Sequence, residues 1–218
     1  MPDESSPEGL TDFQVEVARV FFGLAESEGF LLAGGAALVA QALTDRPTQD
    51  LDFFAGPDSG DIVAARDAFE TAAQERGWSV RRVRDGVTFC RLVVSGPDSL
   101  VVDLALDTPP SRPPTASFIG PTFDLEELAG RKTLALFDRA EARDFTDVYA
   151  LVQRYGKQLL LARAAEVDMG FDMAVFAQML GTLSRFEDSE LPIPGDRVSE
   201  LRSFFASWAV ELVDDRAS

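Results

Sequence analysis

One stretch, from Leu31 to Phe54, limits what this 218-residue chain can fold into more than any other. It reads as an apolar strand, a glycine pair, a short helix, a polar loop and a second strand that carries Asp50 and Asp52. Residues two apart in a strand project from the same side of a sheet. The two carboxylates are therefore predicted to share one small volume, although the segment around them is apolar.

The residue types in this stretch indicate chemistry on phosphate groups. Two neighbouring carboxylates repel each other unless a cation or a proton lies between them. Carboxylate oxygens suit Mg²⁺, which prefers a few carboxylates together with substrate phosphates. Gly34 and Gly35, where the first strand gives way to the helix, offer bare backbone N–H groups to a phosphate. A phosphate cradle followed by Asp50 and Asp52 as metal-binding, catalytic residues predicts phosphoryl or nucleotidyl transfer.

The same residues carry a family resemblance. Gly34-Gly35, followed by the segment RPTQDLDF at positions 46–53, resembles the motif of AbiEii-type nucleotidyltransferases, which include the mycobacterial MenT toxins. The family pattern is a Gly-Gly or Gly-Ser turn and then R-x-[ST]-x-D-[LI]-D-[FL]. The wider polymerase-β-like nucleotidyltransferase superfamily shares only the glycine turn and the Asp-x-Asp. The resemblance covers most of the chain, from about Gly34 to Tyr155.

The resemblance implies a function and a set of partners. It implies an enzyme that transfers a nucleotide from an NTP with the help of Mg²⁺ or Mn²⁺. The implied acceptor is an RNA such as the 3′ end of tRNA, and the implied setting is the toxin of a toxin–antitoxin pair with a cognate antitoxin. The nucleotide-binding residues that it implies in this stretch are Gly34, Gly35, Arg46 and Thr48.

Thr48 is also a candidate for regulation. It lies two residues before Asp50, so its hydroxyl is expected on the same side of the strand, either bonding a nucleotide phosphate or capping the strand entry. Some toxins of the resembled family are silenced when the antitoxin phosphorylates the equivalent hydroxyl. A phosphate on Thr48 would add roughly two negative charges beside the aspartates and obstruct a triphosphate.

The remaining pattern predicts two lobes. An α/β (α+β) nucleotidyltransferase-like lobe with a mixed sheet is expected over residues 1–108, with a helix from Leu10 onward and a hairpin around Asp85-Gly86. Five prolines mark residues 109–123 as a connection that continues neither helix nor strand. An all-helical lobe is expected over 124–218, with helices at 125–137, 142–155, 157–167, 171–186 and 197–213. Residues Pro2 to Gly9 are expected to fray.

The resemblance to nucleotidyltransferases of this fold implies a third carboxylate on a later strand, beside the first pair. Asp103 lies in the apolar segment SLVVDLAL, where an unpaired buried carboxylate is costly. It therefore faces water, pairs with a cation or joins the metal site. Asp107 lies on the same side if the strand extends that far, and is the competing candidate.

The helical lobe adds a basic residue and two acids. Lys132 is one of only two lysines, and its segment resembles the family helix whose lysine contacts nucleotide phosphates, although Arg131-Lys132-Thr133 replaces the usual E-K-L. The segment from Arg143 resembles the family's R-D-x-x-D-L. Asp147 is expected either to hold Lys132 in place or to bind substrate, which makes both candidate catalytic residues. Asp144 is a candidate nucleotide-binding residue, or favours the helix dipole. Arg143 and Asp144 are expected either to bind each other or to tie the two lobes together.

Composition narrows the setting. The formal net charge is −17, which does not favour a protein that grips long nucleic acids over a broad face. The one basic cluster, formed by Arg81, Arg82, Arg84 and Arg91, is either an RNA-backbone contact or a charged edge strand. A single cysteine, Cys90, is expected in the core, and the absence of histidine excludes histidine-based catalysis. No signal peptide and no membrane span are visible, so we expect a cytoplasmic protein.

Two other functions fit part of the pattern. Aminoglycoside nucleotidyltransferases share the glycine turn and the Asp-x-Asp, and the acidic composition suits a cationic acceptor. A catalytically inactive scaffold that only docks a partner is the second alternative, which the intact aspartate pair and Lys132 oppose.

Overall fold

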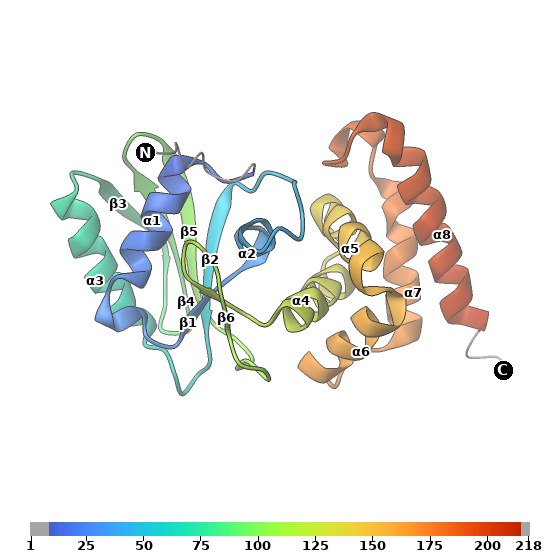
Figure 1. Ribbon diagram of the computed structural model, residues 1–218, viewed down its shortest axis with the longest axis horizontal. Helices are drawn as coiled ribbons and strands as arrows, with labels where there is room; N and C mark the ends of the chain where they lie inside the picture. Colours follow the sequence, from blue (N-terminus) through green and yellow to red (C-terminus); the bar gives the residue numbers. More distant parts are fainter. Residues whose placement is uncertain (1–8, 215–218) are drawn as a thin grey trace. The chain divides into compact units, whose positions relative to one another are not determined.

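The computed structural model describes residues 9–214, and residues 1–8, most of the expected frayed tail, lie outside them. The chain divides into two compact units, Met1–Leu125 and Glu126–Ser218. The first is a mixed sheet with helices and the second is helical, which confirms the fold class expected from the sequence (Figure 1). The expected domain limits of 1–108, 109–123 and 124–218 stay a prediction.

The first unit combines α-helices with strands. Its first helix begins where Thr11 caps it, because the Thr11 hydroxyl accepts from the Gln14 N–H and the Gln14 side chain accepts from the Thr11 N–H. The α-helices and strands up to residue 106 are α1 (Asp12–Phe22), β1 (Phe30–Ala33), α2 (Gly34–Ala40), β2 (Asp50–Ala55), α3 (Ile62–Glu75), β3 (Ser79–Asp85), β4 (Phe89–Ser95) and β5 (Ser99–Leu106).

The strands form one seven-stranded sheet in the order β3-β4-β5-β2-β1-β7-β6, with β6 (Thr115–Ala116) and β7 (Pro121–Thr122) at one edge. β2 runs parallel to β5 and antiparallel to β1, while β3, β4 and β5 form an antiparallel meander. β2 therefore lies in the interior of the sheet, with β5 and β1 as its neighbours.

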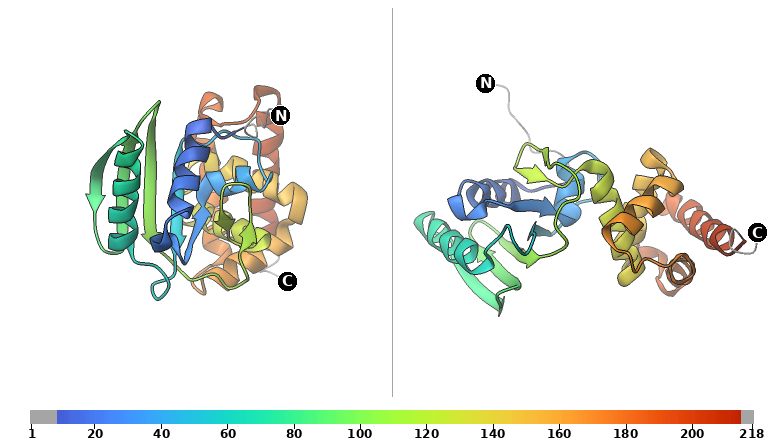
Figure 2. Two further views of the ribbon diagram at one scale, coloured as in Figure 1. Left: turned by 60° about the vertical axis from the view of Figure 1, so that its left-hand side comes forward. Right: turned by 90° about the horizontal axis from the view of Figure 1, so that it is seen from below.

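The two faces of β2 are different. Leu51, Phe53 and Ala55 are buried, and Phe53 stacks on Phe21 of α1 with ring centroids 4.1 Å apart. α1 and α3 lie side by side over this face (Figures 1 and 2). Alternation along the strand sends Asp50 and Asp52 to the opposite face, where both are half-buried. The apolar face anchors the strand and thereby fixes the register of the acidic face.

Two short strands lie in the proline-rich segment. The prolines predict a connection that continues neither helix nor strand, and β6 and β7 within it have two residues each, with β7 paired in parallel to β1 through Leu32 and Thr122. Pro121 opens β7. A proline lacks a donor, but the first position of a short strand near a sheet edge tolerates that loss.

The second unit is built from α4 (Leu125–Asp138), α5 (Ala142–Tyr155), α6 (Lys157–Val167), α7 (Met173–Gly181) and α8 (Val198–Asp214). These helices follow the expected ranges closely except α7, which is shorter than the expected 171–186 because a 3₁₀ segment, Thr182–Arg185, replaces its last turn. The core is aromatic: Trp208 packs edge-on against Phe176 and nearly parallel to Phe205.

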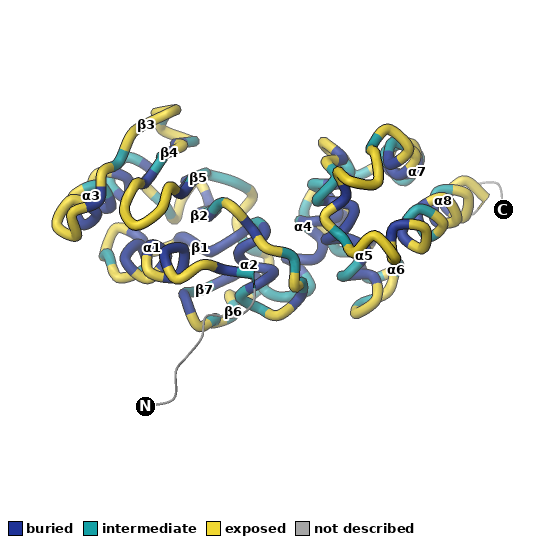
Figure 3. The backbone as a smooth tube through the Cα atoms, turned by 90° about the horizontal axis from the view of Figure 1, so that it is seen from above, coloured by how far each residue is buried: buried dark blue, intermediate teal, exposed yellow. Residues whose placement is uncertain are grey.

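Burial is uneven in the sheet unit. β1 is buried along its whole length and β2 at every second residue, whereas β3, the edge strand, is exposed along almost its whole length (Figure 3). Cys90 on β4 is fully buried, as expected for a core residue, and burial raises the pKa of its thiol to about 11. No helix within residues 9–214 is long and apolar enough to cross a membrane.

Candidate active site

The glycine pair lies directly against the acidic face of β2. Gly34 has a φ of +62°, and a Cβ added there would lie 1.8 Å from Oδ2 of Asp52. A Cβ on Gly35 would lie 2.8 Å from Oγ1 of Thr48 and 3.1 Å from Nη2 of Arg46. Glycine at both positions is what lets the start of α2 approach this closely.

Thr48 links the loop before β2 to both the acid pair and α1. Its hydroxyl donates to Oδ1 of Asp50 over 3.0 Å. Its backbone carbonyl accepts from Nε2 of Gln14 over 3.0 Å, and its side chain is buried. The hydroxyl therefore stands on the aspartate side of the strand, as the sequence predicts. Gly34, Gly35, Arg46, Thr48, Asp50 and Asp52 thus lie together in the first unit.

Asp103 lies next to this group in the sheet. It is the register partner of Asp52 across the parallel β2–β5 pair, so both side chains project from the same face. Asp107, the competing candidate, follows the end of β5, and its carboxylate accepts from the Thr108 N–H over 2.7 Å. Four residues of strand separate the two, roughly 13 Å. The structure favours Asp103 over Asp107 as the acid nearest the pair.

Asp103 has a partner that sequence reasoning did not assign to it. Nε and Nη2 of Arg91 donate to Oδ1 and Oδ2 of Asp103 over 2.8 and 2.6 Å. The sequence held a signal for this pair: Ser95 and Ser99 close the β4–β5 hairpin, and Arg91 and Asp103 lie four residues to either side. Hydrogen bonding to Asp103 raises the pKa of Arg91, opposed by desolvation and assisted by the charges of Asp103, Asp52 and Asp50.

The donor set fits one divalent cation better than two. Asp50 and Asp52 offer carboxylate oxygens from one face of β2, the ligands that Mg²⁺ prefers. Among residues 9–214, no group of three His, Cys, Asp or Glu side chains is arranged to hold a metal ion. Asp103 has the right face and register, but both of its oxygens are bonded to Arg91.

The second unit brings Lys132 and Asp147 together. Nζ of Lys132 on α4 lies 3.1 Å from Oδ2 of Asp147 on α5, and both side chains are buried. Of the two roles expected for Asp147, this contact favours holding Lys132 in place. The phosphate-binding role of Lys132 and the catalytic roles of both residues stay predictions.

Asp144 is engaged at the start of its own helix. It is fully buried, and Arg139 donates to its two oxygens, Nε to Oδ2 and Nη2 to Oδ1, each over 2.9 Å. Its Oδ2 also accepts from the Glu141 N–H over 3.2 Å, which completes a capping box. Arg143 pairs with Glu141, with Nε 2.9 Å from Oε2. These contacts favour a structural role, and nucleotide binding by Asp144 stays a prediction.

The basic cluster predicted from the sequence divides between two faces of the sheet. Arg82 is neutralised on the α3 side, where it lies 2.8 Å from Asp67 and 2.6 Å from Glu70. Arg84 and Arg91 are register partners, and both guanidinium groups lie over the Phe89 ring, 5.0 and 5.8 Å from its centroid. Arg84 and Arg91 therefore belong to the aspartate face, and Arg82 does not.

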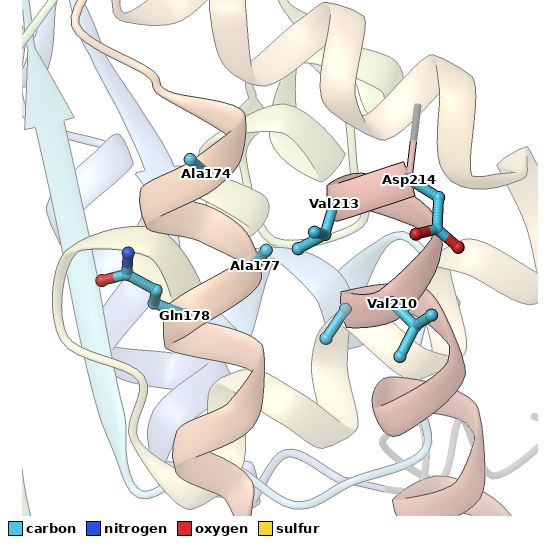
Figure 4. A pocket seen from close by; sticks show the side chains of 7 residues that line it. Ala174, Ala177, Gln178, Val210, Val213 and Asp214 are labelled. Atoms are coloured by element: carbon cyan, nitrogen blue, oxygen red, sulfur yellow. The ribbon is translucent and has the colours of Figure 1, made fainter. Parts of the chain in front are cut away.

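An apolar groove lies within the helical unit, and none of the candidate site residues lines it. It lies between α7 and α8, and Figure 4 shows Ala177, Val210 and Val213 along its walls. Its volume is about 620 Å³. Without a cationic group or a cluster of acids, it does not offer the chemistry of a phosphate or metal site.

Comparison with known proteins identifies relatives of this arrangement. A family model described as "Nucleotidyl transferase AbiEii toxin, Type IV TA system" matches residues 19–205. Among solved structures, JHP933 from Helicobacter pylori is similar with a TM-score of 0.60 and 15% identity, covering 93% of each chain. MenT4, a nucleotidyltransferase toxin from Mycobacterium tuberculosis, is similar with a TM-score of 0.54 and 16% identity, covering 93% of this chain and 90% of its own. No curated protein sequence matches.

Proposed function

Since the chain belongs to the AbiEii family of nucleotidyl transferase toxins of type IV toxin–antitoxin systems, we propose that it is a Mg²⁺-dependent enzyme that adds nucleotides to an RNA acceptor. The 3′ end of tRNA is the leading candidate for that acceptor. The enzyme acts in the cytoplasm, where a cognate antitoxin restrains it. Membership of the family supplies the nucleotidyl transfer. The metal, the acceptor and the residue roles are the parts proposed.

One observation carries the proposal: Asp50 and Asp52 project from the same face of β2, and Gly34 lies against the Asp52 carboxylate. A divalent ion bound to the two carboxylates would offset charge on the nucleotide's phosphates during transfer. The Thr48 hydroxyl orients Asp50 by donating to Oδ1. Gly34 and Gly35 leave room for a phosphate beside the pair, and Arg46 adds a positive charge next to Gly35.

The reaction is a single substitution at phosphorus. The acceptor's hydroxyl oxygen forms a bond to the α-phosphorus of the NTP as the bond from that phosphorus to the bridging oxygen breaks. Diphosphate leaves with the bridging oxygen. The hydroxyl proton passes to a carboxylate of β2, which is half-buried and therefore open to solvent, unlike the fully buried Asp147.

Lys132 and Asp147 are proposed to act as a pair. Lys132 supplies a compact positive charge to the nucleotide's phosphates, and Asp147 positions it from 3.1 Å. Replacing one partner alone leaves the other charge buried, which destabilises a protein by about 3–5 kcal/mol. The informative variant is therefore the double change Lys132→Met with Asp147→Asn. We expect it to stay folded while the KM for NTP rises roughly tenfold or more. An unchanged KM in the folded double variant would remove Lys132 from the phosphate site.

An RNA acceptor is supported by exposed arginines on the aspartate face of the sheet. Arg84 and Arg91 flank Phe89 there, and a positive charge beside an aromatic ring suits a backbone phosphate next to a stacked base. Arg84 and Arg91 make a small basic surface, which agrees with a net charge of −17 and with local contact to the RNA. The acidic composition also keeps a cationic aminoglycoside as the second candidate acceptor.

The deciding experiment follows labelled nucleotide. Each α-³²P-labelled NTP is incubated with the protein, Mg²⁺ and either total tRNA or an aminoglycoside, and the labelled product is separated. We expect the label to appear in RNA, and we expect Asp52→Asn to lower the rate of transfer on the order of 10³-fold. Asp107→Asn is the matched control, because it removes a nearby strand-end carboxylate, and should retain activity. If label were found only in the aminoglycoside, the acceptor would be an aminoglycoside and not RNA. With no transfer at all, and no rise in melting temperature with any NTP and Mg²⁺, the inactive scaffold would be favoured.

Restraint by phosphorylation of Thr48 is a separate proposal. The Thr48 side chain is buried and its hydroxyl is bonded to Asp50, so a modifying enzyme would have to draw the loop before β2 outward. The test compares protection by the antitoxin in cells that express the wild type or a variant. Thr48→Ala should escape protection, and full protection of that variant would exclude this route.

A further inference from the structure

Four charged side chains form one row across the sheet. Asp52 on β2 pairs in register with Asp103 on β5, Asp103 with Arg91 on β4, and Arg91 with Arg84 on β3. Register partners project from the same face, so all four lie on the face opposite the buried one of Phe53. The acidic end of the row, on β2 and β5, holds the proposed metal site, and Arg91 on β4 is separated from β2 by β5 alone.

Arg91 binds Asp103 through a bidentate ion pair. Both oxygens of Asp103 accept from Arg91, over 2.8 and 2.6 Å, and such bidentate pairs are among the strongest charge-assisted hydrogen bonds. The Asp103 side chain is 7% exposed, whereas that of Arg91 is 49% exposed. Guanidinium groups stay protonated in proteins. Asp103 is therefore held by a permanent cation that approaches from the solvent side.

We propose that Arg91 acts as a built-in counter-ion that withholds Asp103 from metal binding, so that the free protein binds one divalent ion, at Asp50 and Asp52. The inference rests on the proposed function, because it presumes a metal at the aspartate pair. A second divalent ion beside Asp52 would draw on Asp103, but each oxygen of Asp103 already accepts from Arg91, and the fixed positive charge of the guanidinium would repel the ion. The positive charge of a second ion is supplied here by the protein itself.

A purely structural ion pair makes a different prediction. If Arg91 only tied β4 to β5, its removal would lower stability and leave metal binding unchanged. If it withholds Asp103, its removal leaves three carboxylates on adjacent strands, Asp50, Asp52 and Asp103. Three such acids repel one another and are relieved by a further cation. Metal stoichiometry therefore separates the two roles without any measurement of catalysis.

The experiment counts Mn²⁺ ions bound by the full chain without nucleotide, using electron paramagnetic resonance to measure free Mn²⁺. We expect one bound ion in the wild type and two in Arg91→Ala. The double variant Arg91→Ala with Asp103→Asn should return to one. Arg84→Ala is the matched control, because it removes a positive charge from the same row without releasing Asp103, and should bind one.

Melting temperature gives a second readout on the same proteins. Saturating Mn²⁺ should raise it more in Arg91→Ala than in the wild type, since a ligand that binds only the folded state stabilises it. If Arg91→Ala does not fold, Arg91→Gln is measured in its place. The expectation that the wild type binds one Mn²⁺ ion is tested in either case.

Each outcome decides something. Two ions in the wild type, or one in both Arg91→Ala and Arg91→Gln, would overturn the role of Arg91 and leave the proposed function standing. One ion that persists in the double variant Asp50→Asn with Asp52→Asn would place the metal elsewhere and overturn the proposed function as well. Absence of binding in every protein would overturn both.

Discussion

Gly34 combines two constraints that no other residue type satisfies. Its φ of +62° is a left-handed conformation, which costs an L-residue roughly 1–2 kcal/mol. Its missing side chain also leaves room for the Asp52 carboxylate, which a Cβ would meet at 1.8 Å. Movement of Asp52 is the simplest relief of that clash, and Asp52 is the residue on which the proposed metal site depends.

We therefore expect Gly34→Ala to lower transfer activity at least about 100-fold. The same change should lower the free energy of unfolding by only about 1–3 kcal/mol. Labelled-nucleotide transfer and urea denaturation measure the two effects. Gly181→Ala is the control, because Gly181 at the end of α7 has no neighbouring atom within 4 Å of an added Cβ. Equal activity of Gly34→Ala and wild type would show that the close approach to Asp52 is dispensable.

Cys90 provides a prediction on pH. Burial disfavours the charged thiolate and raises the pKa from its ordinary 9.0 to about 11. At pH 8 the folded protein should react with a thiol reagent at least about 100-fold more slowly than the urea-unfolded chain. Because the unfolded thiol loses its proton first, stability should fall as the pH rises from about 9 to about 11. A thiol as reactive in the folded state as in urea would contradict burial on β4.

At the scale of elements, the beginning of α5 depends on Asp144. It accepts from Arg139 and from the Glu141 N–H while fully buried. We expect Asp144→Ala to lower the free energy of unfolding by about 2–4 kcal/mol, from a lost cap and a lost buried contact. Urea denaturation measures this.

The control and the contrary outcome use the neighbouring arginine. Arg143 and its partner Glu141 are both more than a third exposed, so Arg143→Ala should change stability by less than about 1 kcal/mol. If Asp144→Ala were as stable as wild type but raised the KM for NTP, the nucleotide-binding role predicted from the resemblance would replace the structural one.

Strand pairing marks where sequence reasoning on the site reached its limit. Alternation along β2 was enough to place Asp50 and Asp52 on one face, because a strand's period is local. The bond between Arg91 and Asp103 depends on the register of a hairpin, which the turn around Gly96 sets. Proximity in the chain groups Arg91 with Arg81, Arg82 and Arg84, and it does not reveal the bond to Asp103. Neighbouring residues in a strand face opposite ways, and the bulge in β3 shifts the register further.

At the scale of the whole molecule, the two units were predictable because their hydrophobic periods differ. Strand patterns mixed with helical ones run up to β5, whereas the spacing from Leu125 onward is helical throughout. The short strands β6 and β7 were not predictable, because two residues carry no period at all. Their place in the sheet comes from pairing with β1, which is a tertiary contact.

The two tryptophans report on the two units separately. Trp78 is buried in the sheet unit, edge-on to Phe13, and Trp208 is buried in the helical unit against Phe176. Because each unit has its own aromatic core, we expect them to unfold at different urea concentrations. The variant Trp208→Phe leaves only the signal of the sheet unit, and Trp78→Phe leaves only that of the helical unit. Mg²⁺ with NTP should move the midpoint of the sheet unit upward, since that unit holds the proposed metal ligands. Coincident transitions in both variants and in circular dichroism would instead show that the chain unfolds as one cooperative body.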